Sequence, residues 1–545
     1  MAFQRPASGM SDSSLTDRAV SVAVLGTGSD VGKSLVSAGL CRLLHRAGIR
    51  VAPFKAQNMS LNSFVTPEGG EIGRAQALQA EACGVPPHVD MNPILLKPES
   101  DTCSQVVVQG KVFSSLDSRA YYDQRPDLFP HVRESFERLA RQYDVIVIEG
   151  AGSAAEVNLR HLDLVNWPVV KLADSQVVLV ADIDRGGVFA QVIGTLELLE
   201  RDERERIAGI IINKFRGDAG LFANGVEFIE QRTGVPVLGV LPFVPDLMLE
   251  EEDRLGIKLS GQSAFKPTHV NVAIILIPHM SNFTDFDLLR QEHDVVLKYI
   301  SSPDELVGVD VVILPGSKNT QTDLKYLLGQ DFQTVLEEHV RQGGELIGIC
   351  GGYQMLGLDI HDPHGVEGGG SSAGLGLLEI QTTLEREKMT TQVEAEALHF
   401  VGFSGIRVRG YHIHMGITRR QNERPCFYIT RTVRNRAGLT GACADEEHSL
   451  DGAIHDGELV WGTYIHGVFD EPDFRRAWLN RVRRRKGLAP LAIDRSEAIN
   501  AQRSHELDRW ADHLQQYIRL RPIWDGLKRR GRPHADFQGL YEDRR

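Results

Sequence analysis

In this chain of 545 residues, the feature that most restricts the possible folds is a glycine-rich loop between a strand and a helix. Residues 19–25 form a short apolar run that predicts a buried β-strand. The run continues into Gly26-Thr-Gly-Ser-Asp-Val-Gly-Lys-Ser34, and residues 35–47 have the pattern of a helix. Glycines at a helix N-terminus expose backbone N–H groups that bind phosphate. The pattern therefore predicts an α/β sheet that carries a nucleotide.

Each polar residue of this loop has an expected role. Lys33 would reach the terminal phosphates, and the Ser34 hydroxyl would hold Mg²⁺. The spacing departs from the common G-x4-G-K-S pattern, because position 27 is Thr and the leading glycine comes one residue earlier. A plain glycine turn is the alternative, but Gly-Lys-Ser between a strand and a helix disfavours it. The predicted nucleotide-binding residues of the loop are Gly26, Thr27, Gly28, Asp30, Gly32, Lys33 and Ser34.

Strand-like runs alternate with helices up to residue 255, which predicts a doubly wound parallel α/β domain over residues 19–255. The later strands are expected over residues 51–55, 143–149, 175–182, 207–212 and 237–242. Residues 91–98 are expected to be irregular, and Lys97 within them faces either a substrate carboxylate or solvent.

Polar residues follow the ends of these strands, where ligands bind in such sheets. Glu149 ends a strand beside the phosphate loop, so it is expected to bind or orient Mg²⁺. Asn213 follows another strand and could read a nucleotide base through its amide. Further candidate substrate contacts at these strand ends are Lys55, Asn58, Asp182, Asp184 and Arg185.

The second half of the chain contains a cysteine on a predicted strand-to-helix elbow. Residues 344–357 read Gly-Glu-Leu-Ile-Gly-Ile-Cys-Gly-Gly-Tyr-Gln-Met-Leu-Gly, with Cys350 in a G-x-C-x-G turn. A lone cysteine after a strand is more often a buried apolar residue, but the flanking glycines favour a nucleophile. The following helix would stabilise a thiolate by its dipole. His466 is the candidate base, and Gly316, after the strand at 309–314, would offer an oxyanion N–H group.

Other polar features of this half have simpler expected roles. Asp285 begins a short helix, and residues 361–372 are rich in glycine and expected to form a loop. His412 and His414 point the same way on a strand, but no further Cys or His at zinc spacing accompanies them, which disfavours a zinc site. The arginine-rich runs at 481–486 and 528–532 are expected to be solvated, with an anionic partner as the alternative.

Composition excludes several classes of protein. The net charge of −13 argues against a general nucleic-acid binder. Six cysteines without C-x-x-C spacing indicate reduced thiols in a cytoplasmic protein. The sequence has no apolar run of about 20 residues, so no membrane span is expected. Residues 1–18 are expected to be a disordered tail and residues 256–269 a linker.

The chain is thus expected to have two sites, one for a nucleotide with Mg²⁺ and one with a Cys–His pair for hydrolysis. One reaction that would use both sites is amidation. The Cys350 half would release ammonia from glutamine through a thioester. The ATP half would activate a carboxylate as an acyl phosphate for the ammonia to attack. Because free ammonia is mostly protonated at neutral pH, both sites belong on one polypeptide.

With these motifs, the sequence resembles the cobyric acid synthase family of vitamin B12 biosynthesis, from about residue 20 to about residue 520. The one-residue shift in the phosphate loop is similar to that of dethiobiotin synthetase. The resemblance implies a class I glutamine amidotransferase-like α/β domain at 270–475 and a helical basic extension at 476–545. The most specific stretches are 26–34, 53–63, 149–153, 181–190, 213–218, 314–320 and the Cys350 elbow.

The resemblance also implies substrates and residue roles. ATP and glutamine would amidate the b, d, e and g carboxylates of adenosylcobyrinic acid a,c-diamide, a corrinoid. Cys350 would be the nucleophile and His466 its base, with Gly316 and Gly351 as oxyanion donors. Ser34 and Glu149 would hold Mg²⁺, while the strand-end polar residues would contact the substrate or its acyl phosphate. A homo-oligomer stays open, and no nucleic-acid or membrane partner is implied.

Two positions depart from related patterns. Many amidotransferases of this type have His-x-Glu, but His466 is followed by Gly467 and Val468, which predicts a Cys–His dyad that relies more on the helix dipole. His412 stands where the family usually has Glu. Two alternatives stay open: cobyrinic acid a,c-diamide synthase, and a partitioning-type ATPase switch with an inactive hydrolase domain.

Overall fold

The structure is a computed structural model that describes residues 19–100, 102–245, 247–249, 264–433, 449–493 and 499–530. The predicted tail at 1–18, part of the predicted linker (256–263) and the end of the second arginine-rich run (531–532) lie outside the described residues. None of the helices in these ranges has the length and apolar composition needed to cross a membrane.

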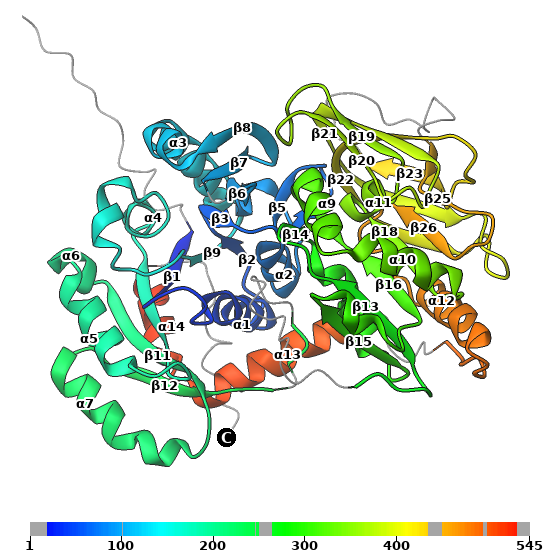
Figure 1. Cartoon of the computed structure of the whole chain (residues 1–545). Coiled ribbons are helices and arrows are strands. Elements are labelled where there is room, and N and C mark those ends of the chain that lie inside the picture. The colour runs from blue at the N-terminus through cyan, green and yellow to red at the C-terminus, as the bar shows by residue number, and fades with distance from the viewer. Residues whose placement is uncertain are drawn as a thin grey trace, which may run out of the picture.

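The N-terminal half contains one parallel sheet with the strand order β12-β11-β10-β1-β9-β2. Apolar residues fill its strands, which are buried on both faces, and helices connect them as in a doubly wound domain. The prediction for this domain is therefore confirmed (Figure 1). The strands are β1 (Val20–Gly26), β2 (Val51–Phe54), β9 (Val145–Glu149), β10 (Gln176–Asp182), β11 (Ile207–Phe215) and β12 (Val237–Pro242).

A smaller sheet, β3-β6-β7-β8, extends the N-terminal half towards the rest of the molecule. It includes β6 (Ile94–Pro98), so the expectation of an irregular segment at 91–98 is wrong for most of that segment. The strand forms because its apolar residues pair with β7 on one side and β3 on the other. The other members are β3 (Gln57–Met59), β7 (Cys103–Val108) and β8 (Lys111–Asp117).

The C-terminal half contains a second sheet, of order β15-β13-β16-β18-β26-β25, in which only the pairing of β25 is antiparallel. β18 (Glu345–Ile349) is central and fully buried, as its apolar residues predict. The other strands are β13 (Val270–Ile275), β15 (Val295–Ile300), β16 (Val311–Leu314), β25 (Ala453–Ile454) and β26 (Val460–Thr463).

A mostly antiparallel sheet covers one side of this half (Figure 1) and is built around the long strands β21 (Ile380–Ala397) and β22 (Arg407–Arg420). The glycine-rich segment at 361–372 contributes to it, since its ends belong to β19 (Asp359–Asp362) and β20 (Gly370–Ala373). The loop prediction therefore holds only for the residues between these two strands.

The C-terminal helices return to the N-terminal half. In Figure 1, α13 (Ile499–Tyr517) runs alongside α1 (Lys33–Arg46), and α14 (Arg521–Arg530) lies behind the first sheet. Trp510 belongs to the same apolar core as α1, and its indole N–H donates to the Leu35 carbonyl at 2.6 Å. The predicted extension thus contains these two helices, and they pack on the nucleotide domain.

The first arginine-rich run is buried in part, because Arg481 and Arg483 are buried whereas Arg484 and Arg485 are exposed; the expectation of a solvated face is therefore wrong for the first two. It belongs to α12 (Pro472–Arg485), which packs beside the second sheet. The Arg481 guanidinium lies 2.6 Å from the buried Glu345 carboxylate, and Arg483 lies 2.9 Å from Asp294. Buried acids from distant strands therefore neutralise these arginines.

Candidate active site

Cys350 lies on a tight elbow between β18 and α11 (Gly351–Met355). Its φ of 52° is unusual for a residue other than glycine, and its side chain is only 5% exposed. A side chain on Gly352 would meet the Leu314 carbonyl oxygen at 2.1 Å, and one on Gly348 would meet the Gly352 carbonyl at 2.6 Å. The glycines around Cys350 are therefore required for the turn, and the predicted elbow is present.

His466 follows β26 and is completely buried beside Cys350. Its Nδ1 lies 2.7 Å from the Asp285 carboxylate, whose second oxygen accepts the Gly467 N–H at 3.1 Å. Burial disfavours the imidazolium, but the charges of the Asp285 carboxylate and of the neighbouring Cys350 raise the pKa of His466 to about 10. The ring is thus held in one orientation and stabilised in its charged form.

Asp285 corrects the prediction of a dyad without an acid. The acid comes from a short helical turn far upstream of His466, and not from the residues that directly follow it. Moreover, α11 spans only residues 351–355, and a helix this short offers a weaker dipole than the sequence implied. The Asp285 carboxylate therefore stabilises the His466 imidazolium, and a thiolate at Cys350 would depend on that cation more than on the helix dipole.

The two predicted oxyanion glycines lie beside this arrangement. Gly316, in β17 (Gly316–Ser317), is so close to His466 that a Cβ would stand 3.1 Å from the ring carbon Cε1. A Cβ on Gly351 would meet the Ser317 backbone nitrogen at 2.8 Å. Gly316 therefore lies against His466, and Gly351, the residue after Cys350, lies against Ser317; their role as donors stays a prediction.

A pocket next to Cys350 is lined by charged and amide groups from both halves of the chain. The half-buried Glu367 carboxylate accepts the Thr320 hydroxyl at 3.3 Å and the Gln321 N–H at 3.1 Å. Burial raises the pKa of Glu367 to about 7. Sequence reasoning missed Glu367, because it lies in the glycine-rich segment. It also missed Gln354, although Gln354 follows the elbow by one helical turn. The polar lining residues include Lys97, Lys318, Thr320, Gln354, Glu367 and Lys388.

Lys97 is buried, so of its two alternatives the solvated lysine is wrong. Its ammonium group lies 2.7 Å from the Glu71 carboxylate, which also pairs with Lys388 of the C-terminal half at 2.5 Å. The nearby Lys318 lies 2.7 Å from Glu99. These ion pairs fix the N-terminal half against the rim of the pocket that Cys350 lines.

The phosphate loop has the predicted conformation, with φ of 97° at Gly32. The Lys33 ammonium donates to the carbonyls of Gly28 at 2.8 Å and Gly152 at 3.0 Å, so it lies across the loop. Asn213 packs against Gly32, and its amide donates to the Val31 carbonyl at 2.8 Å. In this structure the Asn213 side chain supports the loop, and base recognition by it stays a prediction.

Glu149 is completely buried at the end of β9, beside the phosphate loop. Its Oε1 accepts the Ser34 hydroxyl at 2.8 Å and the Lys55 ammonium at 2.9 Å, while Oε2 accepts the Gln79 amide at 2.5 Å. Asn58 joins the group indirectly, because it donates to Gln76 at 2.9 Å. The Ser34 and Glu149 oxygens are thus close enough to bind one ion, and oxygen ligands of this kind suit Mg²⁺.

The other predicted strand-end residues lie around the loop. The Asp182 carboxylate lies 3.2 Å from Lys214, and Arg185 lies 3.1 Å from Asp30 of the phosphate loop. Asp184 lies 2.8 Å from Arg216. The structure therefore brings Asp182, Asp184 and Arg185 to the nucleotide side of the molecule, in contact with cations or with the loop.

His412 and His414 contact other protein groups. The His414 ring stacks on Tyr464 with centroids 3.7 Å apart, and its Nδ1 lies 2.8 Å from the Gly416 carbonyl. Burial holds the pKa of His414 well below its usual value and lowers that of His412 to about 3. Both rings are therefore neutral and partly buried, and His414 lines the pocket.

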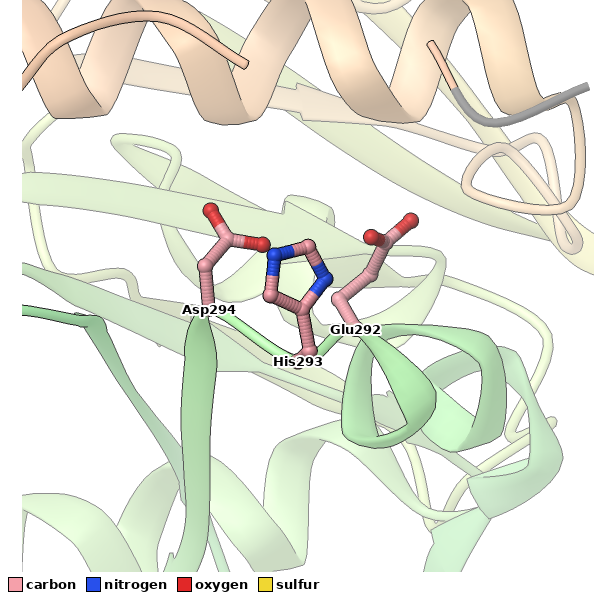
Figure 2. A group of neighbouring side chains, drawn as sticks. All are labelled: Glu292, His293 and Asp294. Carbon is pink, nitrogen blue, oxygen red and sulfur yellow. The ribbon is translucent and has the colours of Figure 1, made fainter. Parts of the chain in front are cut away.

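Within the described residues, one group of neighbouring ligand atoms is spaced as a metal site would be. Figure 2 shows Glu292, His293 and Asp294 side by side between α8 (Asp287–Gln291) and β15. However, the Glu292 carboxylate lies 2.7 Å from Arg475, and Asp294 lies 3.0 Å from Arg476. The arginines of α12 already neutralise these acids, so the cluster joins the helix to the sheet.

Comparison with known proteins agrees with both halves of the site. Residues 22–256 match the CobQ/CobB/MinD/ParA nucleotide binding domain, and residues 271–474 match the CobB/CobQ-like glutamine amidotransferase domain. Among solved structures, PurLQS from Thermotoga maritima aligns with 44% of this chain and 99% of that chain. Its TM-score of 0.28 and identity of 12% are too low to carry an argument.

Two curated relatives match nearly the whole chain. Cobyric acid synthase of Syntrophobacter fumaroxidans is 45% identical over 517 residues, which is 93% of this chain and 98% of the relative. Cobyric acid synthase of Salmonella typhimurium is 46% identical over 519 residues, which is 94% of this chain and 99% of the relative. The chain therefore belongs to the cobyric acid synthase family and is an ATP-dependent, glutamine-hydrolysing amidoligase.

Proposed function

We propose that this chain amidates the b, d, e and g carboxylates of adenosylcobyrinic acid a,c-diamide to give adenosylcobyric acid. Each amidation would consume one ATP and the ammonia of one glutamine. The observation that carries the proposal is the presence, on one chain, of a buried Cys350–His466–Asp285 arrangement and a phosphate loop with a buried acid. The names of the two curated relatives agree with this product.

In the glutaminase half, His466 accepts the thiol proton of Cys350, and Asp285 stabilises the imidazolium that results. The thiolate attacks the side-chain carbonyl of glutamine, and the backbone N–H groups of Gly316 and Gly351 would stabilise the oxyanion. The C–N bond then breaks, and His466 returns its proton to the departing ammonia. Water hydrolyses the thioester to glutamate and restores the thiol.

The charged pocket suits the other end of glutamine. The Glu367 carboxylate and the Gln354 amide would bind the α-ammonium group, and the nearby Lys318 would attract the α-carboxylate. These contacts would hold the substrate amide over Cys350. Because the substrate carries an ammonium group, its binding would favour the ionised form of Glu367.

In the synthetase half, a corrinoid carboxylate attacks the γ-phosphorus of ATP, and ADP leaves. Ammonia then attacks the acyl phosphate and displaces phosphate. Lys33 would bind the terminal phosphates, and Lys55, at the buried Glu149, would neutralise the developing charge. Ser34 and Glu149 would hold Mg²⁺, which supplies further charge neutralisation when bound.

The decisive experiment is a glutamine- and ATP-dependent assay on the corrinoid, followed by mass spectrometry of the product. We expect amides at b, d, e and g. Amidation of cobyrinic acid at positions a and c alone would instead identify the related diamide synthase. Cys350→Ser should abolish glutamine-dependent amidation and leave ammonia-dependent amidation largely intact. Loss of both activities in a folded Cys350→Ser protein would contradict two separate sites.

A further inference from the structure

Ser63 belongs to the N-terminal half but uses all its polar groups at the boundary with the glutaminase site. It begins β4 (Ser63–Val65) and is completely buried. Its backbone N–H donates to the Asn282 side chain at 3.0 Å, and its carbonyl accepts the Tyr411 hydroxyl at 3.2 Å. Its hydroxyl accepts from Lys97, which lines the Cys350 pocket, at 3.0 Å. One residue of the nucleotide domain thus holds two side chains of the other domain.

Both of those side chains contact His466. The Asn282 amide nitrogen lies 3.4 Å from Nδ1 and 3.3 Å from Nε2 of the ring. Nearly equal distances place it over the ring face, and not along the lone pair of either nitrogen. The Tyr411 ring stacks on His466 with centroids 5.3 Å apart, and the two backbones exchange hydrogen bonds of 3.0 and 3.2 Å. Asn282 and Tyr411 therefore restrict where the His466 ring can lie.

The backbone of Asn282 shows that its position is imposed by its surroundings. Its φ of 51° and ψ of 44° are left-handed, which costs energy for a residue other than glycine. The side chain is buried, with its carbonyl oxygen bonded to Ser63. A conformation of this kind persists only where the neighbouring structure fixes it, and here a neighbour is the other domain.

The same strand is tied to the phosphate loop. β4 pairs with β5 (Glu71–Gly73), with Ser63 opposite Gly73, and β5 runs directly into α2 (Arg74–Ala82). On α2, Gln79 donates to Glu149 at 2.5 Å and to the Ser34 carbonyl at 3.2 Å. A displacement of Ser34 or Glu149 on nucleotide binding would therefore be felt by β5 and Ser63.

We infer that β4 of the nucleotide domain is part of the glutaminase site, with Asn282 and Tyr411 as positioning residues that Ser63 holds against His466. This inference rests on the proposed function. Its consequence is that glutamine hydrolysis responds to nucleotide binding at the phosphate loop. The phosphate loop and the glutaminase site both contact the β4–β5–α2 unit, so a shift of this unit at one site changes its position at the other.

The test compares Tyr411→Phe with the wild-type protein, because this change removes the bond to Ser63 and keeps the stacked ring. Glutamate release is measured over a range of glutamine concentrations, with and without ATP, Mg²⁺ and the corrinoid. We expect the stimulated kcat to fall about 3- to 10-fold, the range for one lost hydrogen bond. The KM for glutamine should stay unchanged, stimulation by ATP and corrinoid should weaken, and ammonia-dependent amidation should persist.

Two further variants complete the test. Tyr428→Phe, on an exposed tyrosine of β23 (Phe427–Val433), is the matched control and should behave as wild type. Asn282→Gly keeps the left-handed backbone without strain but removes the amide, so it should lower stimulation as Tyr411→Phe does. Unchanged kcat and stimulation in both interface variants would overturn the inference while leaving the proposed function intact. A rise in KM alone would also overturn it, and absence of glutamate release by the wild type would overturn both.

Discussion

Replacement of Asp285 by Asn should slow glutamine hydrolysis strongly without affecting the synthetase. Asp285 leads the groups that raise the pKa of His466 from 6.5 to about 10 against the effect of burial. At about 1.4 kcal/mol for each tenfold change, this rise corresponds to on the order of 4–5 kcal/mol in favour of the imidazolium. If Asp285 supplies about half of this, its loss costs roughly 2–3 kcal/mol, or about 30- to 150-fold in kcat/KM.

The pH profile provides a second measure of the same effect. In the wild type, activity should persist on the alkaline side until His466 loses its proton near pH 10. Without the carboxylate, the pKa of His466 falls, so the alkaline limb should move to lower pH. Glutamate release and ammonia-dependent amidation would be measured from the same preparation, with the exposed Asp304→Asn as control. A variant within threefold of the wild type, with the same alkaline limb, would refute the assigned role of Asp285.

Three further changes separate the parts of the enzyme. Lys33→Ala should abolish amidation with either glutamine or ammonia but keep unstimulated glutamate release, as phosphate and glutamate assays would show; loss of that release would contradict separate sites. Glu367→Gln should raise the KM for glutamine about tenfold or more, the cost of losing one charged hydrogen bond. Because burial raises the pKa of Glu367 to about 7, the wild-type KM should rise as pH falls below 7, whereas a pH-independent KM would exclude this carboxylate as a ligand. Glu345→Ala leaves the buried Arg481 without its acid and should destabilise the C-terminal half by about 3–5 kcal/mol, measured by calorimetry; an unchanged transition would show that the arginine finds water instead.

Cys350 and His466, the proposed nucleophile and base, could be singled out because each stands in a distinctive local pattern. Cys350 needs glycines around it in the chain, and the tight contacts of Gly348 and Gly352 explain why. The phosphate loop is equally local, since a short stretch supplies the glycines, the lysine and the serine. Both the elbow and the phosphate loop depend on backbone conformations that are determined by residues close together in the sequence.

The contact between Asp285 and His466 could not be predicted, because only the tertiary fold brings the two residues together. Asp285 has the pattern of a helix start, and it meets His466 only after the second sheet has formed. The burial of Arg481 and Arg483 could not be predicted for the same reason, because the acids that neutralise them, Glu345 and Asp294, lie far upstream in the chain. A run of charged residues in a sequence does not show which groups from other segments will lie against it in the folded protein.

The return of α13 and α14 to the first sheet bears on how the protein is made. Their residues Trp510, Leu514 and Trp524 complete an apolar core that begins with β1 and α1. During synthesis, the apolar surface around β1 and α1 stays uncovered until α13 and α14 have left the ribosome. The amidotransferase domain meanwhile has time to fold on its own. Stalled or shortened chains would therefore fail first in the domain that was synthesised first.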